Sequence, residues 1–454
     1  MLSYRKLAMR VLGRPLHTGG IDSPRPASQR AAAFILTAVM LTTLAAPAFA
    51  GTWSIENGDI TVKAGETGND VTQNNVTTKN DTDTIITNSD KDTASSHTVT
   101  IETNDKNDKV EVTLDNVNIK ADSGSALTSK GDVTLTLKGD NSLTGGNGGS
   151  GISSSGSLTI SGGENNSLTA QGGSGSGIFS SGGVTISGGT VNATGGTGGT
   201  GENSNGGSGI YIYSSSGSLT VSGGTVTANG GSGGGNGGDG ISSTNTTISG
   251  GSTVTANGGN GGSLVGGDGI RSGGGLTVSD GTVTAKGGNG DSKDGYGGDG
   301  IRSGGVVTIS GNTVNAAGGY GGKVGGYGIC SFDRVAISGG TVNAAGGNGS
   351  TGGGSGIYSS VIDLSGSLEL TAKAGSPNGK ALSQNGSELV LDTIKDKLGP
   401  GAKVTATDAD GKVIDQVSTP RPVEPEESSS SSDGGSAFRR RAGTERKCRH
   451  TGNF

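Results

Sequence analysis

Three aspartates recur at equivalent positions of the chain, each in the sequence Gly-Gly-Asp-Gly-Ile. They are Asp239, Asp268 and Asp299, and the intervals between them are 29 and 31 residues. Carboxylate oxygens are the ligands that Ca²⁺ prefers, and like charges that stack closely are unfavourable unless they are compensated. Two possibilities are therefore open: a calcium site, or carboxylates that are compensated by solvent or by Arg271 and Arg302.

A second series of candidate residues follows the isoleucines of the broader pattern Gly-x-Gly-Ile. Aromatic rings offer apolar faces to sugar rings, and arginine offers a planar fork for hydroxyl or carboxylate groups. The series predicts a carbohydrate-binding face, and the alternative is a solvated face with scattered rings. Its candidate residues are Phe179, Tyr211, Tyr213, Arg271, Arg302 and Tyr358.

A repeat of about 29 residues must position these side chains. Each repeat contains three short segments that alternate β-branched and polar residues, for example 300–303, 307–310 and 313–316. Such alternation predicts half-buried strands, and three strands in so short a period favour a solenoid over a propeller. Leu127 and Leu382 extend the series of marker isoleucines at its two ends. The markers in the pattern Gly-x-Gly-Ile are Ile152, Ile178, Ile210, Ile241, Ile270, Ile301, Ile329 and Ile357.

We expect an all-β fold, a right-handed parallel β-helix of a single chain with about ten coils, caps and disordered termini. Coils stacked at the spacing of neighbouring strands would make a rod of roughly 48 Å. Ile301, Val307, Ile309 and Val314 would point into a narrow core, and the residue after each marker would face outward. The glycine-rich segments are expected to be loops that tolerate insertions, and the regular repeats suggest no cleft.

Composition narrows the class of protein. Glycine supplies 95 of the 454 residues, and only 29% of the residues are hydrophobic. This is too few for the core of an ordinary large domain. The net charge is −6, and the two ends of the chain, residues 1–50 and 438–454, carry +5 each. Residues 51–437 therefore carry −16. An acidic body argues against nucleic acid as a partner, and two distant cysteines exclude a disulfide framework.

The N-terminus has the features of an export signal, since basic residues precede an apolar run that ends in Ala48-Phe49-Ala50. We therefore predict a signal peptide over 1–50, with no membrane span in the mature chain. The predicted divisions of the chain after the signal peptide are an N-terminal cap with the first coils over 51–123, glycine-rich repeats over 124–386, a C-terminal cap over 387–417, and a Pro/Ser-rich linker with a basic disordered tail over 418–454.

Two other kinds of function have sequence features of their own. Thr-x-Thr pairs such as Thr225/Thr227 and Thr253/Thr255 would form a hydroxyl array that could order ice, although asparagines interrupt it. Parallel β-helices also include polysaccharide-degrading enzymes, which need paired carboxylates or a calcium ion with a base. The aspartates Asp280, Asp333 and Asp363 are isolated in the repeats. We therefore expect no enzymatic activity.

The segments Asp115-Asn116-Val117-Asn118-Ile119 and 133–137, followed by the Gly-x-Gly-Ile turns, resemble a family of secreted bacterial proteins. Its members are called carbohydrate-binding-domain-containing proteins, and the resemblance covers about residues 51–412. It implies binding of a polysaccharide or glycoconjugate outside the cell. We expect a secreted or cell-surface monomer that binds glycans or mediates adhesion; the alternatives are a structural spacer and a polysaccharide-degrading enzyme.

Overall fold

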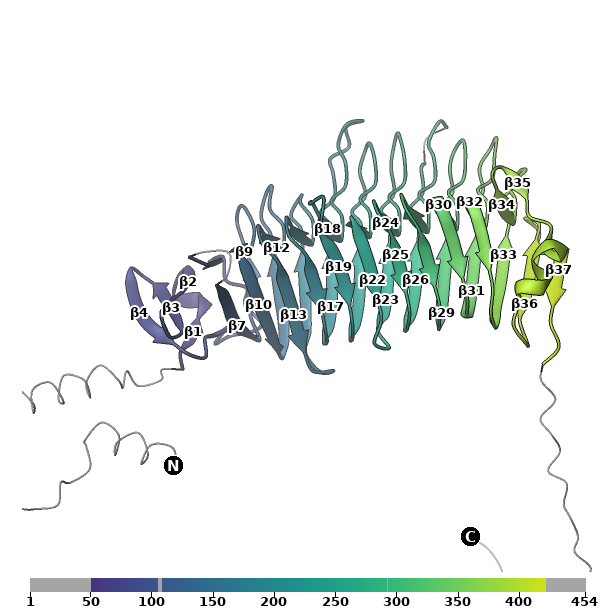
Figure 1. Ribbon diagram of the computed structural model, residues 1–454. Helices are drawn as coiled ribbons and strands as arrows, with labels where there is room; N and C mark the ends of the chain where they lie inside the picture. The colour runs from purple at the N-terminus through teal and green to yellow at the C-terminus, as the bar shows by residue number, and fades with distance from the viewer. Residues whose placement is uncertain (1–49, 105–107, 292, 422–454) are drawn as a thin grey trace, which may run out of the picture.

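The computed structural model describes residues 50–104, 108–291 and 293–421. In this part of the chain, about eleven parallel coils stack into a rod-shaped β-solenoid (Figure 1). The expected parallel β-helix is confirmed, with about one coil more than predicted. The predicted signal peptide lies outside the described residues except for Ala50, and so do residues 422–454 with the basic tail.

Each coil contributes three strands, and those of the example coil lie within one residue of the predicted segments. In the coil that begins at Ile301, they are β27 (Ile301–Ser303), β28 (Val307–Ile309) and β29 (Thr313–Ala317). First and second strands belong to one large sheet, and the eleven third strands form a separate twelve-stranded sheet together with β37 (Val413–Ser418). Below, the three sets are called the first, second and third strands of the coils.

The first strands are β6 (Val99–Glu102), β9 (Leu127–Lys130), β12 (Ile152–Ser154), β15 (Ile178–Ser180), β18 (Ile210–Ile212), β21 (Ile241–Ser243), β24 (Ile270–Ser272), β27, the beginnings of β30 (Ile329–Ile337) and β32 (Ile357–Leu364), and β34 (Leu382–Gln384). The second strands are β7 (Lys109–Asp115), β10 (Asp132–Lys138), β13 (Leu158–Gly162), β16 (Val184–Ile186), β19 (Ser218–Val221), β22 (Asn245–Ile248), β25 (Leu276–Val278), β28 and the ends of β30 and β32. The third strands are β8 (Asn118–Lys120), β11 (Asp140–Thr144), β14 (Ser167–Gln171), β17 (Thr190–Thr194), β20 (Thr225–Asn229), β23 (Thr253–Asn257), β26 (Thr282–Lys286), β29, β31 (Gly340–Ala345), β33 (Leu368–Lys373) and β36 (Lys403–Thr407).

The core is a set of aliphatic files that run along the rod. Ile210 pairs with Ile241, and Ile241 pairs with Ile270, and the same register continues from Leu127 to Leu382. All ten marker side chains are fully buried. Each coil thus covers the apolar side chains of the next, which explains how a chain with few hydrophobic residues still has a continuous core.

Antiparallel strands close both ends of the rod. The N-terminal cap comprises β1 (Thr52–Ser54), η1 (Ile55–Asn57), β2 (Ile60–Ala64), β3 (Asn69–Gln73), β4 (Val76–Asp81) and β5 (Ile85–Thr87). In it, β3 pairs antiparallel with both β2 and β4. At the other end, β35 (Ser387–Glu388) and β37 (Val413–Ser418) pair antiparallel with β34 and β36, beside η2 (Leu391–Lys397). These hairpins satisfy strand edges that a bare coil would leave open.

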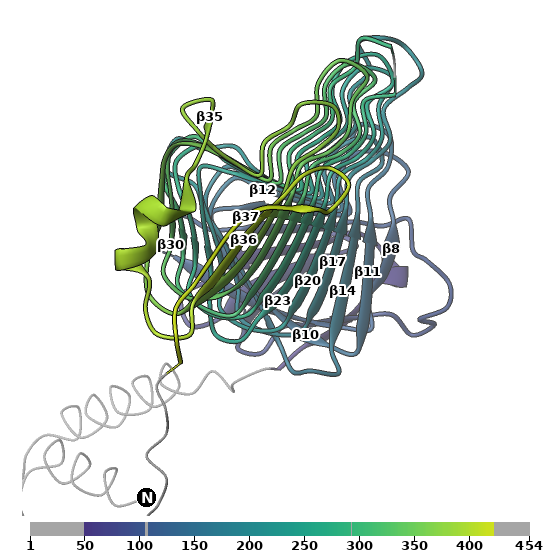
Figure 2. The same cartoon turned by 90° about the vertical axis from the view of Figure 1, so that its right-hand side faces the viewer.

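The glycine-rich segments form an ordered wall, which differs from the loops predicted. Figure 2, a view turned by 90° from Figure 1, shows them stacked in register and projecting from one corner of the solenoid. We call this wall the glycine fin. Each coil sends an outgoing arm up from its third strand and a returning arm down to the next first strand. In most coils of the fin both arms follow the pattern x-Gly-Gly-x-Gly, as in 257–261 and 265–269.

Hydrogen bonds tie the arms together within a coil and between coils. Gly267 N–H in a returning arm donates to the carbonyl of Gly259 in the outgoing arm of the same coil, at 2.8 Å. Gly288 N–H in the next outgoing arm donates to Gly267, also at 2.8 Å. A Cβ atom added at Gly267 would lie 1.9 Å from the carbonyl oxygen of Gly238. Glycine is therefore needed inside the fin because the backbones touch, and other residue types occupy every third position on its faces.

Candidate functional site

A trough runs beside the fin, where its returning arms meet the first strands. The structure forms a cavity of about 580 Å³ there, open to solvent. The prediction that the surface has no cleft is therefore wrong. The ordered fin stands at an angle to the flat face of the first strands, and the cavity lies between them. The residues that line the cavity come from both sides: Asn205, Ser208, Asn236, Asp239, Val265 and Asp268 from the returning arms with their glycines, and Tyr211, Ser242, Arg271 and Arg302 from the first strands.

The floor of the trough is the file of residues that follow the marker isoleucines. Tyr211 pairs in register with Phe179 and with Ser242, and the file continues through Arg271 and Arg302. These positions therefore pair in register as one file, although its member Cys330 is buried. The file brings the aromatic and guanidinium side chains of successive coils to one surface.

Aromatic pairs flank the arginines. The rings of Phe179 and Tyr211 are 5.7 Å apart and tilted, and Tyr213 lies 6.0 Å from Tyr211 with 68% of its surface exposed. Further along the file, Tyr358 stacks on Tyr327 at 4.9 Å, with the two rings nearly parallel. The trough cavity reaches Tyr211, and the Tyr327–Tyr358 pair continues the same face beyond Arg302.

The lower wall of the trough is a ladder of aspartates. The Oδ1 atom of Asp239 accepts a hydrogen bond from Asp268 N–H at 2.8 Å, and Asp268 Oδ1 accepts from Asp299 N–H at 2.7 Å. Asp299 Oδ1 accepts from Tyr327 N–H at 2.7 Å. The three predicted residues are thus stacked on successive coils, and each carboxylate accepts a hydrogen bond from a backbone N–H group of the next coil.

Elsewhere in the fin, neutral asparagine side chains accept the equivalent hydrogen bond from the backbone of the next coil. Asn205 accepts a hydrogen bond from Asn236 N–H at 3.0 Å in the returning arms, and Asn260 accepts from Asn289 N–H at 2.9 Å in the outgoing arms. An asparagine oxygen therefore meets the structural need without the cost of burying a charge. The ladder alone does not require three ionisable residues, and perturbed buried carboxyls in a cavity are typical of functional sites.

Burial makes these aspartates hard to ionise. Only 5% of Asp268 and 4% of Asp299 is exposed, whereas Asp239 is half-buried. Burial, followed by repulsion from Asp299 and Asp239, raises the pKa of Asp268 well above its usual range. Burial also raises the pKa of Asp299 to about 6, although Tyr327 N–H and Arg302 oppose the rise. The acidic wall therefore carries less charge near neutral pH than its composition suggests.

The two arginines have different environments. Arg302 Nη1 lies 3.4 Å from Asp299 Oδ2, and its guanidinium carbon lies 5.2 Å from the centre of the Phe332 ring. Arg271 is exposed and forms no ion pair with any residue that the structure describes. The expected compensation of aspartate by arginine thus occurs at Asp299, and Arg271 remains available to a ligand.

The geometry gives no support to a calcium site. Within residues 50–104, 108–291 and 293–421, no group of three or more His, Cys, Asp or Glu side chains is arranged to hold a metal ion. The ladder explains why, since each aspartate directs one oxygen to a backbone N–H of the next coil. Metal binding by Asp239, Asp268 and Asp299 stays a sequence prediction that these contacts do not favour.

The aspartate ladder predicts a dependence of stability on pH. A carboxyl whose pKa is higher in the folded state than in the unfolded state destabilises the fold as pH rises from the unfolded value through the folded value. The pKa shift of Asp299 from 3.8 to about 6 corresponds to a loss of about 3 kcal/mol over that window. We expect Asp268→Asn, which keeps the acceptor oxygen, to raise the unfolding temperature at pH 8 and to leave it unchanged at pH 4.

The exposed Asp333 offers a matched control, because its Asp333→Asn variant removes one charge outside the ladder. We expect this control to leave the pH dependence of thermal unfolding as in the wild type. Equal unfolding temperatures of wild type and Asp268→Asn from pH 4 to pH 8 would contradict the proposed cost of burying the ladder. Circular dichroism at a series of pH values makes the measurement.

Sequence reasoning missed the part of the trough that the fin supplies. Asn205, Asn236 and Val265 line it from the returning arms. They stand three residues before Ser208, Asp239 and Asp268, and the two intervening glycines face the interior of the fin. The signal was present as a three-residue period in x-Gly-Gly-x, which is typical of an extended, polyproline-II-type backbone rather than of a variable loop.

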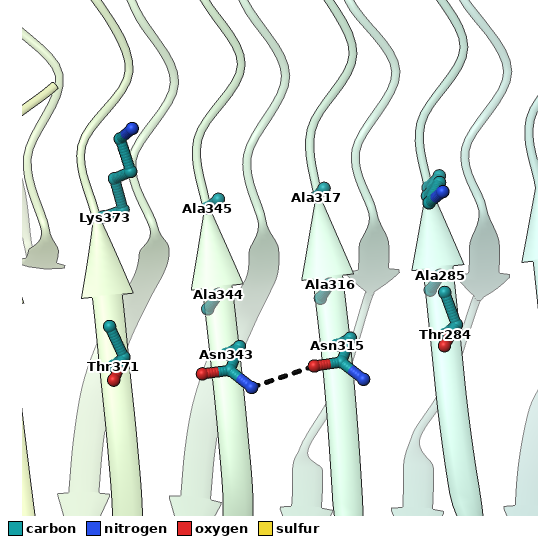
Figure 3. A pocket seen from close by; sticks show the side chains of 11 residues that line it. Thr284, Ala285, Asn315, Ala316, Ala317, Asn343, Ala344, Ala345, Thr371 and Lys373 are labelled. Atoms are coloured by element: carbon teal, nitrogen blue, oxygen red, sulfur yellow. Dashed lines mark hydrogen bonds between the residues drawn. The ribbon is translucent and has the colours of Figure 1, made fainter. Parts of the chain in front are cut away.

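The opposite side of the rod carries a smaller depression of about 280 Å³ over the third strands. Thr284, Asn315, Asn343 and Thr371 lie side by side on adjacent strands, and Asn343 donates to Asn315 at 2.9 Å (Figure 3). This surface contains no aromatic ring among its lining residues. The depression is lined mainly by alanines and by the apolar parts of neighbouring side chains, and because it lacks aromatic rings it offers a control surface.

No family model, no curated protein and no solved structure matches this chain. The resemblance to carbohydrate-binding-domain-containing proteins therefore depends on the sequence motifs, and the trough must be interpreted from its own residues. Among the helices of the described part of the chain, none is long and apolar enough to span a membrane.

Proposed function

We propose that this protein binds carbohydrate, with a glycan chain lying lengthwise in the trough. The observation that carries the proposal is the meeting of two predicted files in one cavity. The aromatic and arginine file supplies the floor, and the aspartate file supplies the wall beneath the fin. Neither file alone would enclose a ligand, whereas together they surround it on two sides.

The chemistry of the trough suits a sugar polymer. Tyr211 and Phe179 offer apolar ring surfaces, while arginine donates hydrogen bonds and aspartate accepts them. Successive coils repeat every ~4.8 Å along the rod, so equivalent contacts recur along a linear ligand. A glycan that lies parallel to the rod axis can therefore use the same kind of contact on several coils.

Because an export signal is predicted over 1–50, we expect this activity outside the cell or at its surface. In that location the ligand would be a polysaccharide or glycoconjugate, and the consequence of binding would be recognition or adhesion. A purely structural spacer remains the second candidate, because a capped rod of this kind also separates whatever is attached to its ends. The spacer predicts no glycan binding.

A glycan array tests the proposal. We expect the purified protein to bind at least one glycan class, and Tyr211→Ala combined with Arg271→Ala to reduce affinity about tenfold or more. Arg271 is preferred to Arg302 for this test, because loss of Arg302 would leave the buried Asp299 unpaired. Matched thermal unfolding of wild type and variant would show that the fold survives.

The control variant combines Thr284→Ala and Asn343→Ala on the opposite face, and we expect it to bind like the wild type. Binding that is lost in the control and kept in the trough variant would refute the proposed site. Release of new reducing ends or of unsaturated products from a bound polysaccharide would instead favour the enzymatic alternative.

A further inference from the structure

We propose that the glycan is acidic, and that Arg271 and Arg302 bind its carboxylate groups. This inference rests on the proposed function and specifies its ligand class. The two guanidinium groups occupy paired positions on adjacent first strands, with Arg271 opposite Arg302 in register. They therefore stand one coil apart on the floor of the trough, a separation of ~4.8 Å along the axis.

Arg271 is the primary candidate because no ion pair holds its guanidinium group, although its charge favours ionisation of Asp239 at longer range. It is exposed, it lines the cavity, and it has no ion-pair partner among the described residues. Next to it, Arg302 adds a second positive charge. Like charges on adjacent coils repel each other, and an anionic ligand that lies between them removes the repulsion.

Arg302 is held in place before any ligand arrives. Asp299 pairs with its Nη1 atom at 3.4 Å, and the Phe332 ring covers the guanidinium at 5.2 Å. Its side chain is still 39% exposed, so part of the fork faces the trough. A fork that is already oriented loses less conformational entropy when it binds a carboxylate than a free lysine would.

Asp268 marks the ligand side of the wall independently of the arginines. Only 5% of Asp268 is exposed, and only its Oδ1 atom accepts a hydrogen bond within the described residues. No fully buried side-chain oxygen in this part of the chain lacks a partner, so Oδ2 opens on to the trough. When protonated, this carboxyl can donate a hydrogen bond to an acidic or hydroxyl group of the glycan.

The positions of the aromatic side chains indicate that the glycan chain runs along the rod. Tyr211 lies two coils before Arg271, and Tyr358 lies three coils after it, so ~10 Å and ~14 Å separate them along the axis. A linear polymer can therefore contact a ring at each end while its charged units lie over the arginines. This spacing favours an extended polysaccharide over a single sugar.

Binding should also strengthen as the pH falls. As the pH drops through about 6, Asp299 takes up a proton and no longer competes for Arg302. Hexuronate groups stay ionised over this range, so the attraction to the arginines grows. The titratable and charged groups that face Asp299 are Asp268 and Tyr327 in the returning arms and Arg271, Arg302 and Cys330 in the first strands.

The test uses two polymers with the same sugar backbone: polygalacturonate, which is anionic, and the same polymer with its carboxylates converted to neutral methyl esters. We expect the full chain to bind the acid about tenfold or more tightly than the ester in calorimetry. The preference for the acid should increase as the pH is lowered from 7.5 to 5, and it should weaken in high salt. The matched pair of variants is Arg271→Gln in the trough and Lys373→Gln on the opposite face.

We expect Arg271→Gln to abolish the preference for the acid and Lys373→Gln to keep it, while Arg271→Lys retains the charge but only part of the affinity. Equal binding of acid and ester that depends on Tyr211 would overturn this inference and leave the proposed function intact. A preference for the acid that survives Arg271→Gln would also overturn it. Failure of both polymers and of every glycan on the array would overturn both proposals.

Discussion

Replacing Gly267 by alanine is expected to destabilise the protein by about 3 kcal/mol or more. The new Cβ atom would lie 1.9 Å from the carbonyl oxygen and 2.5 Å from the carbonyl carbon of Gly238, in the arm of the preceding coil. Because both contacts are with backbone, no rotation of a side chain relieves them. The arms must separate, and the hydrogen bonds that Gly267 makes to Gly259 and Gly288 are lost or weakened. Urea denaturation followed by circular dichroism measures the effect.

Gly273→Ala is the control for this prediction. An added Cβ at Gly273 would find its nearest atoms at 3.9 Å, which is an ordinary contact distance. We expect its free energy of unfolding to stay within about 0.5 kcal/mol of the wild type. If Gly267→Ala were as stable as Gly273→Ala, the close packing described for the fin would be wrong, and the glycine-rich segments would be loose loops. Glycan binding should fall with Gly267→Ala as well, because the fin forms one wall of the trough.

Replacing Ile241 by alanine is expected to cost about 2–5 kcal/mol of unfolding free energy. Its side chain is fully buried between those of Ile210 and Ile270 in the files of the core. Deleting three carbons leaves a cavity between coils, and a stack held in register by strand pairing has little freedom to close it. Denaturation with urea, with the slope compared between variants, gives the change in free energy.

Val361→Ala provides the matched comparison on an exposed position of β32, where 46% of the valine surface is accessible. We expect a change of no more than about 0.5 kcal/mol there. Similar small losses at both positions would show that the marker isoleucines do not form the core. A large loss at Ile241 with none at Val361 supports the inward file that the register describes.

The strands could be predicted from the sequence because each carries a local alternation that repeats along the chain. Val307 and Ile309 bracket a threonine, and this pattern has only one arrangement that buries both aliphatic side chains. Since the same pattern returns about every 29 residues, the marker Ile301 had to lie over Ile270 and beneath Ile329. Local pattern and repeat length together determine the register.

The trough could be predicted only in part. The floor followed from the alternation, so Tyr211 and Arg271 were expected on one outward file. The wall depends on how glycine-rich arms pack against one another, and that packing comes from backbone contacts between coils rather than from side-chain pattern. For the same reason the burial of Asp268 was not foreseen, since an aspartate beside glycines looks exposed until the arms of the fin are placed around it.

Cys330 shows the limit of the outward file as a guide to exposure. It occupies the position after a marker isoleucine, and the register places it between Arg302 and Tyr358. Only 1% of it is exposed, and burial raises the pKa of its thiol to about 12. A small side chain between two long ones is covered even on an outward file, so facing away from the core does not guarantee contact with solvent.

A structure of the protein with a bound oligosaccharide is the most direct test of the central claim, which is that the trough holds a glycan chain. We predict sugar rings between the first strands and the returning arms, in contact with Tyr211 and Arg271, and a chain direction parallel to the rod. Sugar density over Thr284 and Asn343 on the opposite face, with the trough filled only by solvent at a saturating ligand concentration, would contradict the claim.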